Sequence, residues 1–200
     1  MLEAPASAVL IQAFVNTVDV ELGTDELVTP SRLGAWLVAW ELLDPRAGLG
    51  QADLDAALRL RAGLRERLGV PVGDVPDPQS LRQADEVLRA LPVVFELGTG
   101  EPPGRFVPSP ELPPLEGALA RLAIAWGDLV GTGESTRLKR CPEHACAWVF
   151  WDVSKNRSRR WCSMRVCGNR TKARRYAAKH APSPRKQDAV DVEPIGPAGS

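Results

Sequence analysis

The chain has 200 residues, of which 44% are hydrophobic and 25% are charged, and its formal net charge is zero. This composition is typical of a globular protein with one ordinary domain, or with one domain and a small module. No run of about 18 apolar residues is present, which excludes a membrane-spanning helix.

The charge is distributed unevenly along the chain. Residues 1–136 hold 10 Arg, no Lys and 20 Asp or Glu, a formal charge of −10, whereas residues 137–186 hold 15 Lys or Arg and 2 acidic residues, a charge of +13. This asymmetry predicts an acidic domain joined to a module that binds a polyanion. The N-terminus lacks the basic start of a secretory signal, so we expect a cytoplasmic protein.

The acidic part is predicted to be rich in helix. Residues 8–18 are apolar and fit a buried helix or a buried strand, of which we favour the helix. Leu and Trp side chains at helical spacing predict four more helices, over residues 29–43, 51–69, 77–92 and 113–133. Residues 93–97 and 105–109 flank a Gly/Pro turn and predict a β hairpin. This region has no His, no Cys and no Gly-rich phosphate loop, so we do not expect an enzyme.

Two arginines of the acidic part stand out. Arg61 and Arg65 fall within the leucine arc of the helix predicted over residues 51–69, where charged side chains are unusual. In one interpretation they are salt-bridged, or extend to solvent, at the edge of the core. In the other they form an anion pocket with Asn16, and this pocket binds a small anionic ligand, as the sensor domain of a regulator requires.

All four cysteines lie within 27 residues and have the spacing C-x4-C-x15-C-x4-C; they are Cys141, Cys146, Cys162 and Cys167. In a reducing cytosol, clustered cysteines bind metal more often than they form disulfides. Two equally spaced pairs suit the tetrahedral geometry of Zn²⁺, and four protein ligands leave no position for a catalytic water. We therefore predict one structural zinc ion, with two disulfides as the alternative. His144 is an alternative ligand, but we favour a solvated turn residue because four cysteines already fill the site.

The cysteine module predicts its own small fold. Residues 145–162 predict a strand, a polar turn and a second strand, with aromatic side chains as a small core. Residues 168–180 predict a helix, in which Gly168 permits the turn and Asn169 is the N-cap. A zinc knuckle, a hairpin and a helix in this order are treble-clef-like. The predicted fold class is therefore α+β, mostly α: a helical N-terminal domain with a short β hairpin, followed by this treble-clef-like zinc finger.

The cysteine module resembles the CGNR zinc finger of bacterial proteins. The resemblance covers about 40 residues and rests on Asp152, Ser154, Asn156, Arg160, Trp161, Cys162, Ser163, Met164 and the run Cys167-Gly168-Asn169-Arg170. The region before it resembles the ABATE domain that accompanies this finger, through AFVNTVD at 13–19 and AGLRERL at 62–68. The resemblance implies a stress-linked transcription regulator.

The chain accordingly divides into three parts. Residues 1–134 are an ABATE-like regulatory domain, residues 135–181 are the CGNR finger, and residues 182–200 are a tail that is rich in Pro and Ala and is predicted to be disordered. We expect the helical domain to fold without zinc, because it has its own apolar stripes, and the finger to unfold when zinc is removed.

Eight basic side chains of the finger are candidates for binding nucleic acid: Arg157, Arg159, Arg160, Arg170, Lys172, Arg174, Arg175 and Lys179. Lys172, Arg175 and Lys179 share one face of the predicted helix and are the better candidates for phosphate contacts. Arg170 and Arg174 lie on a neighbouring face that we expect to pack on the zinc core, with Arg170 bonding to knuckle carbonyls. The alternative partner of the basic residues is the acidic domain of the same chain.

Duplex DNA is the predicted partner of the finger, and RNA or another protein is the alternative. One short finger contacts few base pairs, so we expect a homodimer to provide useful specificity.

Overall fold

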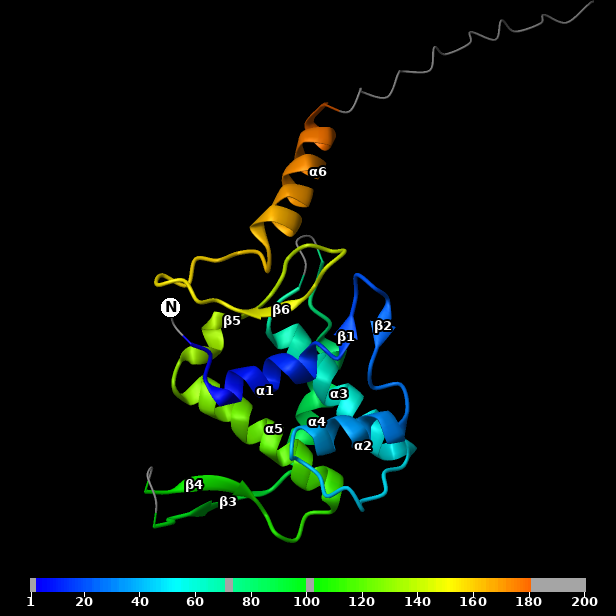
Figure 1. Cartoon of the computed structure of the whole chain (residues 1–200), viewed down its shortest axis with the longest axis vertical. Helices are drawn as coiled ribbons and strands as arrows, with labels where there is room; N and C mark the ends of the chain where they lie inside the picture. The colour runs from blue at the N-terminus through cyan, green and yellow to red at the C-terminus, as the bar shows by residue number, and fades with distance from the viewer. Residues whose placement is uncertain (1–2, 71–73, 100–102, 181–200) are drawn as a thin grey trace, which may run out of the picture.

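The computed structural model describes residues 3–70, 74–99 and 103–180, so the tail predicted over residues 182–200 lies outside the described residues. Helices make up most of the N-terminal part, and Figure 1 shows α1 lying across α5 inside it. The helices of this part are α1 (Ala6–Val15), α2 (Pro30–Ala39), α3 (Gln51–Arg67), α4 (Pro78–Arg89) and α5 (Pro114–Gly131). The apolar segment 8–18 therefore forms a helix, as favoured, over most of its length.

The strands form antiparallel pairs and no larger sheet among the described residues. The pairs are β1 (Val18–Asp19) with β2 (Thr24–Asp25), β3 (Val93–Glu96) with β4 (Arg105–Pro108), and β5 (Leu138–Arg140) with β6 (Val149–Trp151). The pair β3–β4 is the hairpin predicted from the Gly/Pro turn. The predicted class, mostly helical with small antiparallel hairpins and a four-cysteine finger, is confirmed.

Local capping fixes where two of the helices begin. The Thr29 hydroxyl accepts a hydrogen bond from the backbone N–H of Arg32 at the start of α2. The Asp77 carboxylate accepts the backbone N–H groups of Gln79 and Ser80 at the start of α4. A proline in the first turn of each helix suits a position whose N–H has no helical partner. α2 ends at Ala39, before the predicted residue 43, because Glu41 has a left-handed φ of 56°.

One apolar core holds the helices together. α1 lies in it, and the side chains of Ile11, Phe14 and Val15 are fully buried. Strand residues of the finger belong to the same core: Leu138, Val149 and Trp151 are buried with the helices. The four-cysteine region adds only a small second cluster around Phe150. The helical domain and the finger are thus packed against each other and share apolar side chains. The expectation that the helical domain folds without zinc stays a prediction.

The strands of the finger differ from the prediction. β5 precedes the first cysteine and pairs with β6, so the hairpin surrounds the first cysteine pair; the predicted second strand does not form. Residues after β6 instead follow an irregular path around the buried carboxylate of Asp152. This carboxylate accepts hydrogen bonds from Lys139 Nζ, from the Ser154 hydroxyl and from the backbone N–H of Arg159. These contacts replace a second ladder of strand hydrogen bonds.

The last helix begins differently from the prediction. A single π-helical turn, η2 (Met164–Gly168), leads directly into α6 (Asn169–His180), and the Ser163 hydroxyl accepts the backbone N–H of Val166 at the start of this turn. Asn169 is therefore inside the helical run and is not its N-cap. Gly168 is also not a left-handed turn residue; a Cβ there would lie 2.5 Å from the sulfur of Met164. Figure 1 shows α6 projecting away from the rest of the described chain.

Candidate metal centre and nucleic-acid interface

The first cysteine pair lies on a tight knuckle between β5 and β6. Cys141 follows β5, and its backbone N–H donates to the carbonyl of Trp148 at 2.8 Å. The backbone N–H groups of Cys146 and Ala147 both donate to the carbonyl of Glu143, at 2.9 and 3.0 Å. Ala147 has a φ of 49°, which turns the chain back into β6. These contacts point both thiols to the same side of the hairpin.

The second pair comes from the segment that leads into α6. Cys167 lies on the η2 turn, and its backbone N–H donates to the Ser163 carbonyl at 2.9 Å. The Cys162 sulfur lies 3.4 Å from the sulfurs of both Cys146 and Cys167. All four Sγ atoms, including that of Cys141, lie within 4.8 Å of one another.

This sulfur geometry fits zinc. Tetrahedral Zn²⁺ with Zn–S bonds of about 2.3 Å places its sulfur ligands about 3.8 Å apart. The four cysteines are free thiols, and the closest separations are much longer than a disulfide bond of about 2.05 Å. The predicted site for one zinc ion is confirmed, and the alternative of two disulfides is not what the structure shows. The zinc has a structural role, because four thiolates complete its coordination shell.

The electrostatics of the cluster favour neutral thiols unless a cation is bound. Burial, followed by the neighbouring thiols, raises the pKa of Cys162 well above its ordinary value. Burial is also the largest cause that raises the pKa of Cys167, to about 12, although the hydrogen bond with Cys162 acts to lower it. Thiolates gathered this closely are stable only beside a positive ion, so metal binding must release their protons. His144 lies outside this cluster and is about half exposed, with its Nδ1 3.4 Å from the Asp74 carboxylate.

Glu143 attaches α6 to the knuckle. Its side chain is fully buried, and the carboxylate accepts hydrogen bonds from the Thr171 hydroxyl, at 2.9 Å, and from the Arg174 guanidinium. Burial alone would raise the pKa of Glu143, but these two donors outweigh it and hold that pKa below its ordinary value. Arg174 is thereby bound to the finger itself. The sequence offered no signal for Glu143, because a lone acidic residue in a turn is ordinarily solvated.

Other basic candidates also have partners within the chain. The Arg157 guanidinium donates to the Gly133 carbonyl at 3.1 Å. Arg159 donates to the Trp161 carbonyl at 2.9 Å, and its guanidinium carbon lies 4.8 Å from the centre of the Phe150 ring. Arg170 pairs with Glu21, next to β1, at 2.7 Å, and not with knuckle carbonyls as expected.

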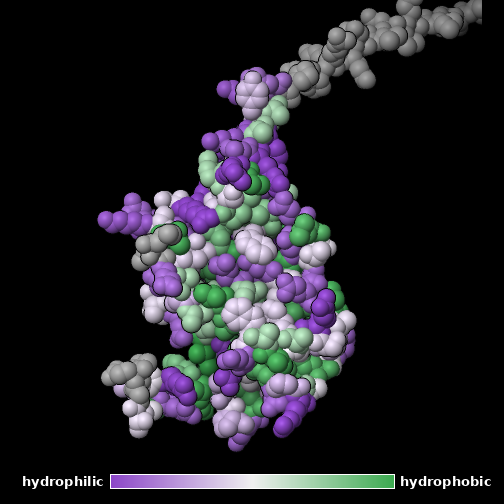
Figure 2. All heavy atoms as spheres, in the orientation of Figure 1, coloured by the Kyte–Doolittle hydropathy of each residue, from purple (hydrophilic) through white to green (hydrophobic). Residues whose placement is uncertain are grey.

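Four of the eight candidates remain available to another molecule. Within the described part of the chain they are exposed and have neither a side-chain hydrogen bond nor an ion pair: Arg160, whose guanidinium carbon lies 5.1 Å from the centre of the Trp161 ring, Lys172, Arg175 and Lys179. Three of them lie on α6, where Figure 2 shows mostly hydrophilic residues. Lys155 and Arg165 are further exposed cations of the finger without a side-chain hydrogen bond or ion pair among the described residues, and they were not among the predicted candidates. Neither Lys155 nor Arg165 lies on the face of α6 that carries Lys172, Arg175 and Lys179.

Comparison with known families agrees with this architecture. The model of the ABATE family, described as "Putative stress-induced transcription regulator", matches residues 8–133, more than half of the chain. The chain belongs to the ABATE family. The model of the CGNR zinc finger matches residues 137–180, which contain all four cysteines. No curated protein matches the chain. Among the described residues, none of the helices combines the length and the hydrophobicity of a membrane-spanning segment.

The three residues expected to line an anion pocket in the ABATE domain are arranged otherwise. Arg61 pairs with Asp25 and also donates to the Thr17 hydroxyl. Arg65 donates to backbone carbonyls of α1 and of the finger, at Val15 and Ala147. Burial, and then the nearby positive charges of Arg140 and Arg61, lower the pKa of Arg65 to about 10.

The third predicted pocket residue, Asn16, also binds protein atoms. Its side-chain amide both donates to the carbonyl and accepts from the N–H of Val149 in β6, at 2.8 and 2.9 Å. The polar groups of the three residues therefore bind protein atoms and are not directed at a shared ligand. Asn16 and Arg65 hold the finger against the ABATE domain, whereas Arg61 has the salt-bridged role that was the other interpretation.

Proposed function

We propose that this protein is a cytoplasmic transcription regulator that binds duplex DNA through α6 of its zinc finger. The observation that carries the proposal is the alignment of Lys172, Arg175 and Lys179 on one face of a projecting helix. None of these side chains has a charged or hydrogen-bonding partner among the described residues. Such a face attracts phosphates, and the major groove of B-DNA is wide enough to admit an α-helix.

In this proposal the role of the zinc site is to hold α6 in position. A segment of this size cannot bury enough apolar surface to fix a helix, and the metal holds the knuckle and the start of α6 together instead. Glu143 then fixes the rotation of α6 through Thr171 and Arg174. Because these contacts hold one side of the helix, the Lys172 side is left to face a ligand.

The distribution of ion pairs argues against the acidic domain as the partner of this face. Arg170 does reach that domain, through Glu21. Lys172 and Arg175, however, form no ion pair with any described residue of it, although it carries an excess of acidic residues. We therefore interpret Arg170 as a residue that orients α6.

The test compares two triple variants of the zinc-loaded full chain. In the first, Lys172, Arg175 and Lys179 are replaced by Ala. The control replaces three exposed arginines of the acidic domain, Arg32, Arg82 and Arg89. Binding to a pool of random duplex DNA is measured over a range of salt concentrations, with RNA as competitor.

The first variant should bind duplex DNA more weakly and lose roughly 0.9 from its salt slope for each phosphate contact removed. The control should bind DNA as tightly as the unmodified protein or slightly more weakly, because it removes charges outside the proposed surface, and the zinc content of all three proteins should be equal. Full affinity and an unchanged slope in the first variant would show that α6 is not the binding surface. Preferential displacement of DNA by RNA would change the assigned nucleic acid.

A further inference from the structure

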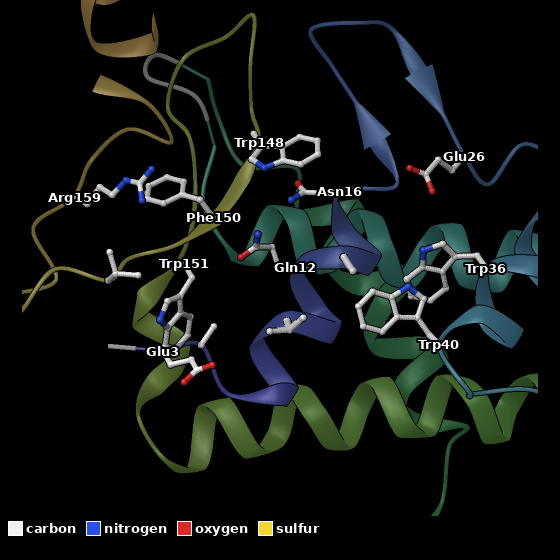
Figure 3. Close-up of a pocket in the computed structure, with 14 residues that line it drawn as sticks. Glu3, Gln12, Asn16, Glu26, Trp36, Trp40, Trp148, Phe150, Trp151 and Arg159 are labelled. Carbon is white, nitrogen blue, oxygen red and sulfur yellow. The ribbon is translucent and has the colours of Figure 1, made fainter. Parts of the chain in front are cut away.

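A groove of about 920 Å³ lies where the ABATE domain meets the finger. Its floor is one face of α1, including Gln12. One wall is formed by Trp36 of α2 and by Trp40, which follows the last residue of this helix. The other is formed by Phe150 of β6 and by Trp148, which precedes this strand (Figure 3). This volume is at the upper end of the range for sites that enclose small organic molecules.

The walls of the groove are aromatic. The rings of Trp36 and Trp40 are stacked, with centroids 5.7 Å apart and planes 29° apart. Trp36, Trp40 and Trp148 are only partly buried, so each retains ring surface outside the core. Indole faces bind flat aromatic molecules by stacking, and their negative quadrupole favours a positive charge over the ring.

The acidic groups of the groove are unpaired, in contrast to its arginine. The carboxylates of Glu3 and Glu26 have no hydrogen bond or ion pair within the described residues, and Figure 3 shows the Glu26 carboxylate turned toward the groove beside Trp36 and Trp40. The guanidinium of Arg159 is already held by the carbonyl of Trp161 and by the ring of Phe150. The charge left for a ligand at the Trp36–Trp40 end is therefore negative.

We propose that this groove binds a planar aromatic cation, stacked on Trp40 and paired with Glu26. Both preferences of the site agree, because the indole faces and the free carboxylate each favour positive charge. This is the opposite sign from the ligand predicted for Asn16, Arg61 and Arg65. Of these three residues only Asn16 lines the groove, and its side-chain amide is already bonded to the backbone of Val149. The proposal does not rest on DNA binding and is tested without nucleic acid.

The test uses two probes with the same tricyclic ring and opposite charge. They are 9-aminoacridine, a cation at neutral pH, and acridine-9-carboxylate, an anion. Binding to the zinc-loaded full chain is measured by calorimetry. We expect saturable binding of about one cation per chain, and several-fold weaker binding of the anion.

Variants then locate the site. Glu26→Gln keeps the size of an exposed side chain and should weaken binding of the cation about threefold, with the loss diminishing at high salt. Glu26→Lys should reverse the preference between the two probes. Trp40→Ala should weaken binding of the cation roughly tenfold. Glu111→Gln, an exposed change away from the groove, is the matched control and should have no effect.

Three results would overturn the proposal. The first is the absence of saturable binding of the cation to the unmodified protein. The second is equal affinity for the cation and the anion. The third is unchanged binding of the cation in both Glu26→Gln and Trp40→Ala, which would place the probe elsewhere, for example on the exposed pair Phe95 and Phe106 of the β3–β4 hairpin. Zinc content and circular dichroism establish that each variant is folded.

Discussion

At the scale of single residues, Arg61 is a charge buried in an apolar arc. Its side chain is 9% exposed, and its guanidinium donates to both carboxylate oxygens of Asp25, at 2.7 and 2.5 Å. The hydrogen bonds from Arg61 hold the pKa of Asp25 below its ordinary value of 3.8, against burial, which acts to raise it. The pair connects the β1–β2 hairpin to α3. The sequence showed that Arg61 is a charged residue on an apolar helix face. It did not show that Asp25 is the residue that pairs with it.

We predict that Asp25→Asn lowers the free energy of unfolding by about 2–4 kcal/mol at pH 7, because the guanidinium then stays buried without a counter-charge. Since folding depresses the pKa of Asp25, the stabilisation is complete above about pH 4 and is lost as the pH falls through the depressed value. The difference between wild type and variant should therefore shrink below about pH 4.

Urea denaturation of both proteins at pH 7, 5 and 3.5 measures this difference. Protonation of the zinc ligands in acid affects both proteins and cancels in the comparison. Asp85→Asn, on the exposed side of α4, is the control and should change stability little at any pH. A difference that stays constant down to pH 3.5 would contradict the prediction.

At the scale of elements, α3 and α4 pack closely because one position has no side chain. A Cβ at Gly63 would lie 2.2 Å from the Cβ of Ala84 and 2.9 Å from the carbonyl oxygen of Ser80. Both contacts are far inside van der Waals separation and involve groups that cannot rotate away. Gly63 therefore permits the approach of the two helices, although Gly weakens a helix by about 1 kcal/mol relative to Ala.

We predict that Gly63→Ala destabilises the protein by about 1–3 kcal/mol, because overpacking between α3 and α4 exceeds the gain in helix propensity. Gly127→Ala in α5 is the matched control. A Cβ at Gly127 meets no atom within 4 Å, so this change should stabilise the protein by roughly 0.5–1 kcal/mol. Urea midpoints that move in the same direction for both variants would contradict this account of the helix contact.

At the scale of the whole molecule, the finger completes the core of the ABATE domain. Val149 is fully buried in that core, and both of its backbone groups bond to the side chain of Asn16 in the turn after α1. Full burial of one such apolar side chain contributes about 1.5–3 kcal/mol. A metal that holds the β5–β6 hairpin in place therefore also supports α1.

We predict that removing zinc loosens α1 together with the finger. The intact protein should contain about one zinc per chain. After chelation, amide hydrogen exchange should rise in α1 as well as in residues 138–168, because the hairpin no longer covers the helix. Cys162→Ser, which lacks one ligand, should exchange like the chelated protein and respond little to chelator. Loss of zinc with unchanged exchange in α1 would show that the two parts are independent.

Features that depend on residues close together in the chain follow from the sequence alone. Periodic leucines specify the helices, Thr29 and Asp77 set the starts of two of them, and the Gly/Pro turn specifies the β3–β4 hairpin. The four cysteines were also identifiable, because their spacing is itself the ligand pattern of zinc. Each of these features is encoded by short-range sterics, capping or a small set of soft ligands.

The partners of the polar and charged groups inside the molecule, in contrast, depend on how distant segments pack. The partner of Asn16 lies 133 residues away, and the Arg174 guanidinium meets the one buried carboxylate of the knuckle, at Glu143. A helical period shows which side a residue occupies but not what packs against that side. The distinction between bound and available cations, and the aromatic groove between α1, α2 and β6, therefore arise only when distant segments pack together.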